Sequence, residues 1–475
     1  MPSGPHRYAR RVMADPAASG AVLDVPALAK ELGERFAAAG HELYLVGGSV
    51  RDLVLSRRAS DLDFTTSAHP SDTTAILRGW ADRQYLVGVT FGTVGATKHN
   101  ERLEITTFRQ EVYAEEHRKP SVTFGKDLDT DLSRRDFTIN AMAIALPDGA
   151  FVDPYGGIRH LAAKVLDTPL DPEVAFTDDP LRMVRAARFV AQLDVTPTQR
   201  VVDAMRAMRS RLEIVSAERI RDELDKLLVA PAPGKGLELL VDTGVSDGFL
   251  PELSAMQLEQ DPVHRHKDVL HHTYAVVERT EPDLTLRIAA LLHDAGKPAT
   301  REITDEGVQF HHHEMVGARM ADKRMRELRY PNHMIDDVRR LVEMHLRFHG
   351  YGDGWSDAAV RRYVRDAGPL LDQLNQLTRA DCTTRNERKA ARFARLQDEL
   401  EERIAQLAEQ ENLEAMRPPL NGAKVMEHLG IEPGRIVGEA LDYLMDLRLE
   451  RGPIDEAEAY ALLDAWAAER ELPGA

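Results

Sequence analysis

The chain has 475 residues, of which 43% are hydrophobic and 29% are charged, and its formal net charge is −17. A chain of this length divides into about three or four domains. It contains no run of the ~18 apolar residues that a membrane-spanning helix needs, and its acidity argues against a protein that only binds nucleic acid. The single cysteine, Cys382, cannot form an internal disulfide, so we expect a cytoplasmic protein.

The order of predicted elements indicates a mixed head and a helical body. Residues 1–24 have no apolar stretch typical of a signal peptide and are expected to be flexible. Short β-rich runs alternate with helical stretches between residues 42 and 155, and from Asp179 onward the pattern is helical almost throughout. The expected fold class is therefore α+β, with a head followed by an all-α body. A long amphipathic helix packed within the chain is predicted by the spacing of Phe393, Leu396, Leu400, Ile404 and Leu407.

Two local stretches depart from the overall acidity. From Arg379 to Arg395, six basic residues stand against two acidic ones, and from Arg182 to Lys226 ten stand against seven. A phosphate-binding track on an otherwise acidic chain therefore stays open.

The stretch YLVGGSVRDLVLSRRASDLDFTT, residues 44–66, joins a glycine turn to a pair of aspartates. In a strand, Asp61 and Asp63 would project from one face, and a divalent cation such as Mg²⁺ relieves the repulsion between them. Gly47 and Gly48 would let backbone amides approach a phosphate, and Arg51 could add a bidentate contact. Each motif alone is compatible with an ordinary turn or a solvated face. Together, in one strand–helix–strand unit, they favour a metal–nucleotide site.

A third carboxylate could complete a two-metal site. Glu104 lies within RLEITTFR, among apolar and β-branched neighbours where an unpaired charge is costly. It could also be a strand residue on the solvent face. The chemistry that three such carboxylates support is in-line attack by a hydroxyl on an α-phosphate.

The motifs GGSVRD and DLDF resemble the signature of the DNA polymerase β-like nucleotidyltransferases, specifically the class II tRNA nucleotidyltransferase/poly(A) polymerase family. Four further segments are similar to motifs of that family in the same order: RRDFTINAMA, DPYGGIRHLAAKVL, DDPLRMVRAARF and ERIRDELDKLL. The resemblance implies a polymerase β-like head, with Arg135, Asp136 and Asn140 near the sugar and phosphates. It also implies that Asp179 and Arg182 select the base and that residues 218–228 brace this pair.

The spacing of Asp179 and Arg182 gives partial independent support. Residues three apart on a helix share a face, and a carboxylate with a guanidinium could read cytosine or adenine. Asp179 before Pro180 could equally be a helix N-cap. Arg185 and Arg188 could be solvated or could reach nucleotide phosphates. The segment QEVYAEEHRKPSV is intact, and in the family a shortened segment there marks enzymes that add only the two cytidines, so the resemblance favours completion with adenosine.

Histidine and aspartate recur in five segments downstream: VLHHTYAVVE, LLHDAGKP, FHHHEMVGARM, LVEMHLRFH and RADC. Histidines in helices often only donate to a carbonyl, but this clustering is more than that role explains. The segments resemble the HD metal-dependent phosphohydrolase domain. The implied metal ligands are His272, His293, Asp294 and Asp381, and His313 and His345 are candidates for a second metal or a substrate phosphate. The metal could be Mn, Ni, Fe or Mg, and the sequence leaves open whether this domain is active.

The resemblance implies five regions. They are a flexible N-terminus (1–24), a catalytic head (25–155), a helical neck (156–255), an HD domain (256–385) and a C-terminal tRNA-binding body (386–475). The expected function is template-independent addition or repair of the 3′-terminal CCA of tRNA from CTP and ATP with Mg²⁺. The alternatives are a poly(A) polymerase and an HD phosphohydrolase with a nucleotide-sensing head. No membrane partner is expected, and the sequence does not specify the oligomeric state.

Overall fold

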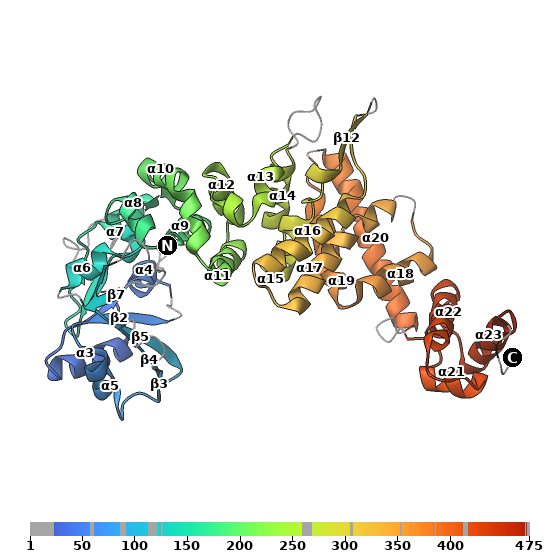
Figure 1. Ribbon diagram of the computed structural model, residues 1–475, viewed down its shortest axis with the longest axis horizontal. Coiled ribbons are helices and arrows are strands. Elements are labelled where there is room, and N and C mark those ends of the chain that lie inside the picture. Colours follow the sequence, from blue (N-terminus) through green and yellow to red (C-terminus); the bar gives the residue numbers. More distant parts are fainter. Residues whose placement is uncertain are drawn as a thin grey trace, which may run out of the picture. The chain divides into compact units, whose positions relative to one another are not determined.

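The computed structural model describes residues 23–57, 61–85, 92–112, 121–124, 127–258, 268–304, 307–351, 354–384, 386–411, 417–470 and 472. The chain divides into two compact units, Met1–Ser254 and Ala255–Ala475, whose elements are labelled in Figure 1. Within the described residues, no helix is long and apolar enough to cross a membrane. The predictions for residues 1–22 and for the central part of QEVYAEEHRKPSV, residues 113–120, lie outside the described residues.

The first unit is built on a seven-stranded sheet with the strand order β3-β4-β5-β2-β1-β8-β9. The strands are β1 (Leu43–Val46), β2 (Leu62–Thr66), β3 (Arg83–Tyr85), β4 (Thr93–Lys98), β5 (Glu101–Thr107), β8 (Ala143–Leu146) and β9 (Phe151–Val152). Only β2 and β5 pair in parallel; the other neighbouring strands are antiparallel. Two small pairs complete the strands: β6 (Arg109–Val112) with β7 (Ser121–Phe124), and β10 (Val165–Leu166) with β11 (Thr196–Pro197).

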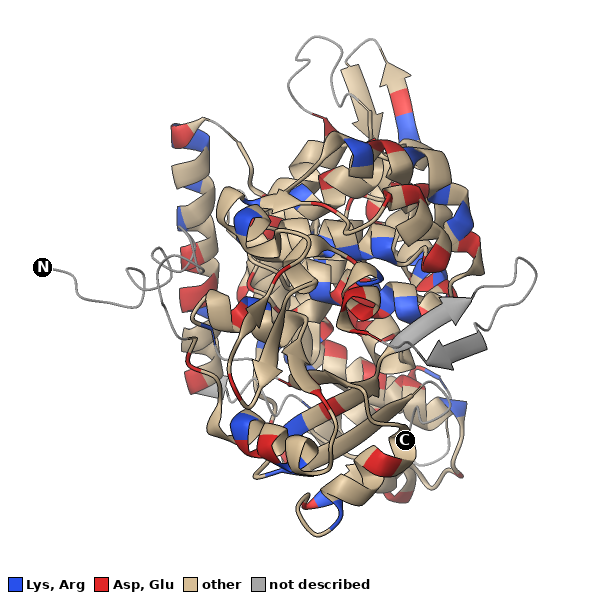
Figure 2. Cartoon of the chain, turned by 90° about the vertical axis from the view of Figure 1, so that its left-hand side faces the viewer, with Lys and Arg blue, Asp and Glu red and all other residues tan. Residues whose placement is uncertain are grey.

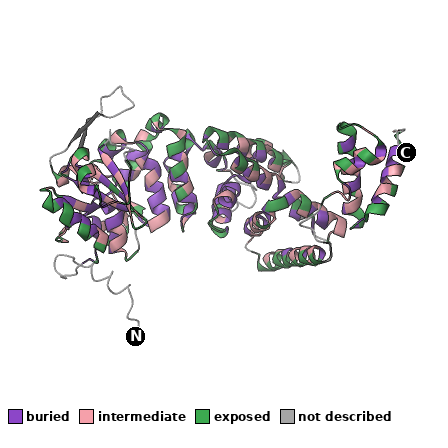
Figure 3. Ribbon diagram, turned by 90° about the horizontal axis from the view of Figure 1, so that it is seen from below, coloured by how far each residue is buried: buried purple, intermediate pink, exposed green. Residues whose placement is uncertain are grey.

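Apolar side chains of the strands pack against the first helices and are buried there. Leu43, Leu45 and Phe64 are almost fully buried, and Figure 3 shows buried residues along the strands with exposed ones on the outer faces of the helices. Helix α3 (Ala27–Ala38) packs against β1 and β8, α5 (Pro70–Leu77) against β4 and β5, and α4 (Gly48–Val54) against β1 and β2. Burial of these side chains, at roughly 1.5–3 kcal/mol each, stabilises the sheet that carries the predicted carboxylates.

Helices continue the first unit beyond the sheet. They are α6 (Leu128–Ser133), α7 (Gly157–Ala163), α8 (Pro172–Asp178), α9 (Arg182–Leu193), α10 (Gln199–Met208), α11 (Ala217–Leu228), α12 (Pro233–Asp242) and α13 (Pro251–Ala255), with short 3₁₀ turns η2 (Thr138–Asn140), η3 (Arg209–Ile214) and η4 (Ser246–Gly248). Helix α9 packs against both α11 and α12. It is buried along most of its length, including Met183, Val184 and Phe189, and therefore forms the centre of this helical layer.

The second unit is mainly helical. Its helices are α14 (Val269–Arg279), α15 (Leu284–Leu292), α16 (His313–Glu327), α17 (Asn332–Met344), α18 (Asp357–Ala367), α19 (Leu371–Asp381), α20 (Glu387–Glu411), α21 (Gly422–Leu429), α22 (Arg435–Arg451) and α23 (Glu456–Ala468), with 3₁₀ turns η5 (Pro298–Thr300), η6 (Arg347–Tyr351) and η7 (Gly368–Leu370). The last three helices share a core around Val425, Leu444 and Trp466. The predicted amphipathic helix is confirmed as α20, in which Leu400 and Leu407 are buried.

The α+β head followed by a helical body is confirmed, with one departure in the body. A hairpin of β12 (Arg301–Thr304) and β13 (Gly307–Phe310) interrupts the helices of the second unit. The hairpin was not predicted, because the run REITDEGVQF is mostly polar. All four residues of β12 are exposed, Ile303 among them, so hydrophobic periodicity carries no strand signal there.

Candidate active site and metal centre

The glycine turn joins β1 to α4. Gly47 has φ 69° and ψ −135° and caps α4, a backbone conformation that favours glycine. A Cβ at Gly47 would lie 2.8 Å from Nη1 of Arg135 and 4.0 Å from Oδ2 of Asp63, so the absence of a side chain lets these groups approach the backbone. Ser49, which the sequence analysis did not single out, is buried and ties the turn to β2. Its Oγ donates to the carbonyl of Asp61 and accepts from the amide of Asp63, both at 3.0 Å.

The structure places Asp63 and Glu104 side by side. They are direct partners in the parallel pairing of β2 with β5. Burial raises the pKa of Asp63 to about 6, and the charges of Glu104 and Asp61 add to this while Arg135 and Arg51 oppose it. Asp61 is exposed and comes one residue before β2, which corrects the prediction that both aspartates lie within the strand. Asp63 and Glu104 offer only oxygen donors, and the raised pKa of Asp63 indicates that its charge lacks full compensation. Both features fit a hard divalent cation.

A cavity of about 510 Å³ lies beside the glycine turn. Of the predicted residues, it brings together Gly47, Gly48, Asp63, Arg135, Asp136, Asn140, Asp179, Arg182 and Arg185. A second cavity of about 410 Å³ is lined by Asp63, Glu104, Arg135, Asp179 and Arg182, among others. Arg51, Asp61 and Arg188 line neither cavity. Asp63 of the sheet and Asp179 and Arg182 of the α8–α9 region line both cavities. The predicted metal site and the predicted base-selecting pair therefore share one continuous surface.

Asp179 and Arg182 do not share a helix face, contrary to the prediction. Helix α8 ends at Asp178 and α9 begins at Arg182, so Asp179 lies in the break between them. The N-cap of α9 is Leu181, whose amide donates to Oδ1 of Asp179 at 3.2 Å. Arg182 donates to the carbonyls of Ala175 at 3.2 Å and Arg134 at 2.5 Å. These contacts to α8 and to the segment after α6 set where α9 starts, and they leave both side chains on the cavity wall.

Helix α11 contributes the groups that hold this region. Oδ2 of Asp179 pairs with Nη2 of Arg219 at 2.8 Å. Asp222, Glu223 and Lys226 of the same helix also line the larger cavity. The family resemblance implied a bracing role for residues 218–228 without indicating these side chains. The spacing of Arg219, Asp222 and Lys226, three and four residues apart on a helix, was the available signal.

An ion-pair network lies behind the cavity. Arg185 pairs with Asp136 at 2.5 Å and with Glu223 at 3.1 Å, and Arg188 pairs with Glu223 at 3.0 Å. Burial would raise the pKa of Asp136, but Arg185 and Asn140 hold it well below its ordinary value. Burial and the neighbouring Arg185 lower the pKa of Arg188 to about 10. Arg188 is only 9% exposed, which excludes the solvated alternative for it. The carboxylates hold both arginines in place.

Arg51 also has protein partners. Its Nε donates to Oδ1 of Asp52 at 2.9 Å, and its Nη1 donates to Oδ1 of Asn140 at 2.8 Å. Its guanidinium lies 5.5 Å from the ring centroid of Phe189. In this structure Arg51 therefore orients Asn140, and the prediction that it contacts phosphate stays a prediction.

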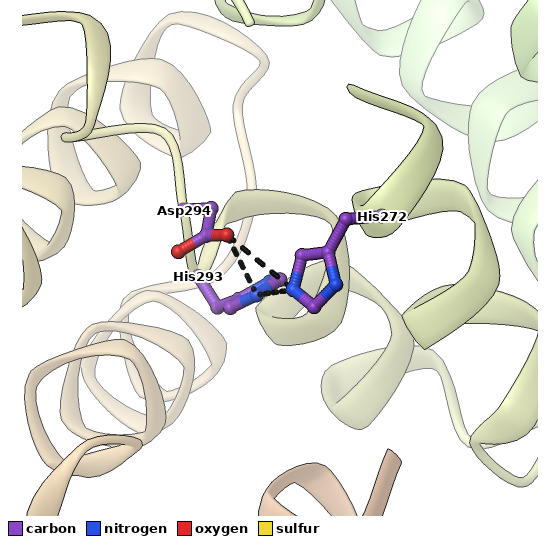
Figure 4. Close-up of side chains that lie close together, drawn as sticks. All are labelled: His272, His293 and Asp294. Carbon is purple, nitrogen blue, oxygen red and sulfur yellow. Dashed lines mark hydrogen bonds and ion pairs between the residues drawn. The ribbon is translucent and has the colours of Figure 1, made fainter. Parts of the chain in front are cut away.

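The second cluster lies in the second unit, where His272 of α14 meets His293 and Asp294 at the end of α15 (Figure 4). Nε2 of His272 is 3.2 Å from Nε2 of His293 and 3.5 Å from Oδ2 of Asp294. It is 2.9 Å from Oδ1 of Asp381, the last residue of α19. The structure thus brings together the four residues implied by the resemblance, although they come from three helices and span more than a hundred positions.

A second group shares Asp294 and adds His313 and His345. The ligand atoms of Asp294, His313 and His345 all lie within 4.8 Å of one another, as do those of His272, His293 and Asp294. Oδ1 of Asp294 is 3.4 Å from Nε2 of His313. Among the described residues, the buried Nε2 atoms of His313 and His345 have no hydrogen-bond partner. A buried nitrogen without a partner is costly unless a ligand occupies the space beside it, so these atoms fit a metal or a bound phosphate.

Backbone carbonyls orient the imidazoles. Nδ1 of His293, His313 and His345 lies 2.8 Å, 2.9 Å and 2.7 Å from the carbonyls of Ala290, Phe310 and Val342, respectively. A carbonyl only accepts, so each Nδ1 carries a proton, and in the neutral imidazole this leaves Nε2 as the atom that can bind a metal. Nδ1 of His272 lies 2.8 Å from Oγ1 of Thr383. The carbonyl contact recurs at three of the four histidines, which is the pattern of metal-ligating histidines.

The pKa values of His293 and His345, one from each ligand group, are shifted in opposite directions. Burial would lower the pKa of His293, but Asp294 and Asp381 raise it above its ordinary value. Burial, together with the charge of His293, lowers the pKa of His345 to about 3. Lys297 donates to Oδ2 of Asp294 at 2.7 Å. Lys297 was quoted in LLHDAGKP but not singled out, although its i,i+3 spacing from Asp294 was a usable signal.

Glycines set the spacing between the two groups. A Cβ at Gly296 would lie 2.1 Å from the carbonyl oxygen of His313 and 2.7 Å from the amide of Gly317. The backbone after Asp294 and the start of α16 are therefore in direct main-chain contact. This contact holds Asp294 and His313 at the short distance that a shared ligand requires.

Three family models match the chain. A poly A polymerase head domain matches residues 43–167, a probable RNA- and SrmB-binding site of polymerase A matches residues 194–257, and an HD domain matches residues 268–410. The ranges fall on the sheet with its glycine turn, on the helical layer around α10–α13, and on the histidine centre with α20, respectively. The fold and the two sites define a nucleotidyltransferase head joined to an HD domain.

Relatives narrow the family. The A-adding tRNA nucleotidyltransferase of Deinococcus radiodurans is 35% identical over 444 residues, which cover 90% of this chain and 96% of that protein. The CCA-adding enzyme of Anoxybacillus flavithermus is 41% identical over 221 residues, and the match covers 46% of this chain and 54% of that enzyme. The matches thus span only about half the length of such curated CCA-adding relatives. The chain belongs to the tRNA nucleotidyltransferase/poly(A) polymerase family.

Solved structures share the fold over almost the whole chain. The Bacillus stearothermophilus CCA-adding enzyme in complex with CTP matches with a TM-score of 0.69 and 26% identity, covering 94% of this chain and 99% of that one. The Thermotoga maritima CCA-adding enzyme complexed with tRNA matches with a TM-score of 0.56 and 19% identity, covering 97% of this chain and 98% of that one. The second likeness shows the fold alone.

Proposed function

We propose that the head transfers nucleotides from CTP and ATP to the 3′ end of tRNA, building or repairing the terminal CCA without a nucleic-acid template. The observation that carries the proposal is the register of β2 with β5. It sets Asp63 beside Glu104 on the wall of a cavity that Arg135, Asp179 and Arg182 also line. One site thus offers carboxylates that can bind a metal ion, cationic side chains that can bind phosphate, and an aspartate and an arginine that can contact the nucleobase.

Each group has a chemical role in this reaction. The terminal 3′-hydroxyl of the RNA attacks the α-phosphorus of the incoming nucleotide, and pyrophosphate leaves in line. Asp61 and Asp63, with Glu104 as a third ligand, would hold Mg²⁺, which when bound stabilises the charge on the attacking and leaving oxygens. The amides of Gly47 and Gly48 and the guanidinium of Arg135 bind the triphosphate. Asp136 and Asn140 fix the wall beside the sugar.

Base selection is assigned to Asp179 and Arg182. A carboxylate accepts from the exocyclic amine of cytosine or adenine, and a guanidinium donates to a ring acceptor. Uracil and guanine present the opposite polarity at those positions. Arg219 is paired with Asp179 and Arg182 is tied to two carbonyls, so the pair is preorganised for this discrimination.

A second candidate is addition of the terminal adenosine alone. It is favoured by one observation: the relative matched over 96% of its length is named an A-adding tRNA nucleotidyltransferase. Poly(A) tailing uses the same chemistry with more additions.

The test supplies tRNAs ending before CCA, after C, after CC and after CCA, with CTP and ATP singly and together, and sequences the products. CCA addition predicts extension of each incomplete end and a stop after one adenosine. Extension only of the tRNA ending in CC would select A-addition, and a growing A-tract would select tailing. No extension of any RNA with Mg²⁺ would refute nucleotidyl transfer by the head.

For the second unit we propose metal-dependent hydrolysis of a phosphoester. His272, His293, Asp294 and Asp381 would hold one ion, and His313 and His345 with Asp294 would hold a second ion or a substrate phosphate. The mixed imidazole and carboxylate donors suit Mn²⁺, Fe²⁺ or Ni²⁺ as well as Mg²⁺. The supporting observation is the pair of buried Nε2 atoms without hydrogen-bond partners.

A tRNA substrate for the head also agrees with the predicted cytoplasmic location, which stays a prediction.

A further inference from the structure

Ser49 lies behind the wall of the larger head cavity. It is the second residue of α4, it is only 2% exposed, and it is not among the residues that line either described cavity. Its neighbours Gly47 and Gly48 and its hydrogen-bond partner Asp63 do line the larger cavity. The hydroxyl of Ser49 can therefore act on a bound ligand only through these residues.

The hydroxyl of Ser49 takes the place of strand β1 at the start of β2. The pairing of β1 with β2 ends with Leu45 opposite Phe64. One residue further, the amide of Asp63 donates to Oγ of Ser49, and this Oγ donates to the carbonyl of Asp61. In an extended strand, the backbone groups of residues two apart point to the same edge. One side chain thus binds a donor and an acceptor that a neighbouring strand would otherwise bind.

These two hydrogen bonds enclose Leu62, the residue between the two aspartates. Because the carbonyl of Asp61 and the amide of Asp63 meet the same oxygen atom, the peptide groups on the two sides of Leu62 are held in one orientation. The pairing of β2 with β5, in which Leu62 is the partner of Leu103, holds the other edge. The backbone that carries the aspartates is therefore held from both edges, and Ser49 holds one of them.

The same serine also belongs to the glycine turn. It directly follows Gly48, and a Cβ at Gly47 would lie 4.0 Å from Oδ2 of Asp63. The amides that we assign to the triphosphate are therefore close to a carboxylate that we assign to Mg²⁺, and Ser49 joins the two segments. Magnesium binds protein carboxylates and substrate phosphates at the same time, so it needs these two segments at a fixed separation.

The charge of the chain makes this separation important for affinity. Figure 2 shows Lys and Arg interspersed with Asp and Glu over the helices, and the net charge is −17. A nucleoside triphosphate is itself an anion, so the overall charge of the chain does not attract it. A cation held by carboxylates beside the glycine turn would offset negative charge on both sides. We therefore expect nucleotide and cation to bind more tightly together than either binds alone.

We propose that Ser49 is a positioning residue that couples these two binding events. Its hydroxyl holds the aspartates at the separation from the glycine turn that a complex of nucleotide and Mg²⁺ needs. Without the hydroxyl, the amide of Asp63 loses its partner, and the start of β2 can shift relative to the turn. The triphosphate and the cation can then each still bind, but they strengthen one another less. This inference rests on the nucleotidyl transfer proposed for the head.

The test measures this coupling with the full chain and without RNA, so that no transfer takes place. Isothermal titration calorimetry gives the Kd of CTP in excess Mg²⁺ and in EDTA, and the ratio of the EDTA value to the Mg²⁺ value is the coupling factor. Formation of the complex of Mg²⁺ with CTP in solution is the same for every variant and cancels in the comparison.

Three variants are compared with the wild type. Ser49→Ala removes the hydroxyl, and Ser49→Thr keeps one at the same position. The matched control is Ser246→Ala, because Ser246 is a fully buried serine of the same unit whose Oγ donates to the carbonyl of Leu240 at 3.3 Å. Far-ultraviolet circular dichroism and thermal unfolding check that each variant is folded.

We expect Ser49→Ala to lower the coupling factor about tenfold and to leave the Kd of CTP in EDTA within about twofold of the wild-type value. Ser49→Thr and Ser246→Ala should keep the wild-type factor. In nucleotide addition to tRNA, Ser49→Ala should raise the Mg²⁺ concentration for half-maximal rate about tenfold, and saturating Mg²⁺ should restore most of kcat. Excess Mg²⁺ would not repair a loss of stability alone.

Three results would overturn the proposal. A coupling factor unchanged by Ser49→Ala would show that the hydroxyl does not link the turn to the aspartates. An equal fall for Ser246→Ala would show that the loss of any buried hydroxyl has this effect. A wild-type Kd for CTP that does not depend on Mg²⁺ would show that there is no coupling. If the wild-type chain extends no RNA, the proposed transfer fails, while the CTP affinities still decide whether Ser49 couples cation to nucleotide.

Discussion

The two candidate sites are held in place in opposite ways. In the head, the carboxylates lie at the surface of a sheet, and Asp61 and Glu104 are exposed, while a buried ion-pair network behind the cavity fixes its arginines. In the second unit, four of the six implied ligands are buried, and backbone carbonyls orient three of the imidazoles. The head therefore suits a labile, oxygen-bound ion that arrives with its substrate, and the histidine centre suits a resident ion.

The largest expected effect separates the two chemistries. Asp63→Ala should reduce nucleotide addition to tRNA by about 10³-fold, equivalent to about 4 kcal/mol, because it removes the most buried of the three carboxylates. Phosphoester hydrolysis should be unaffected. Asp148→Ala, at an exposed turn of the same head, is the matched control. Addition within tenfold of the wild type would contradict the assignment of Asp63 as a metal ligand.

The next effect concerns the resident ion. His293→Ala should weaken binding of Mn²⁺ or Ni²⁺ to the metal-free full chain by about 100-fold. The substitution removes a buried metal ligand together with its orienting hydrogen bond to the carbonyl of Ala290. Isothermal titration calorimetry measures the affinity. His311→Ala, which changes an exposed histidine near the centre, should leave it unchanged. An undiminished affinity would show that the imidazoles are structural.

The buried network should matter for stability in a pH-dependent way. Arg185→Met should destabilise the first unit by about 2 kcal/mol at pH 7, because Asp136 and Glu223 lose their shared cation. The folded-state pKa of Asp136 is held below its ordinary value of 3.8. Its contribution is therefore fully present above about pH 4 and is lost as the pH falls further.

Urea unfolding followed by the fluorescence of Trp80 measures this effect. Trp355 and Trp466 are replaced by phenylalanine in the parent protein, so that only the first unit reports. The difference between wild type and variant should shrink at pH 3. Arg206→Met, which breaks an exposed pair with Asp203, should cost less than about 1 kcal/mol. If Arg185→Met lowers the free energy of unfolding by no more than that, the buried ion-pair network does not stabilise the first unit more than an exposed pair does.

The smallest effect tests preorganisation of the base-reading pair. Arg219→Ala should raise the KM for CTP about threefold and increase incorporation of UTP, because Asp179 loses a partly exposed ion pair worth less than about 1 kcal/mol. Arg206→Ala removes a comparable surface arginine paired with Asp203. Nucleotide competition with sequencing of the products measures the error rate. An unchanged error rate would mean that Asp179 holds its position without α11.

Much of both sites could be predicted from residue types and spacing. A glycine turn followed by paired aspartates predicts a metal–nucleotide site, and five segments rich in histidine and aspartate predict a metal centre, because few other roles need these residue types at such spacing. The prediction that was wrong and the alternative that stayed open both depend on tertiary contacts. Asp179 and Arg182 do not share a helix face, because α9 starts at Arg182, which bonds to the carbonyls of Ala175 and Arg134. Arg188, for which the sequence left two alternatives, points inward and pairs with Glu223 of another helix. No local pattern contains those partners.

The direct contact at Gly296 has a consequence for how the histidine centre can change. Because main chain meets main chain there, no side chain is available whose size could widen or narrow the gap between the two ligand groups. Adaptation to a different ion would have to proceed by exchanging the donors themselves. Even Gly296→Ala would force the two ligand-bearing segments apart. The lack of a side chain at this position therefore fixes the distance between the two ligand groups.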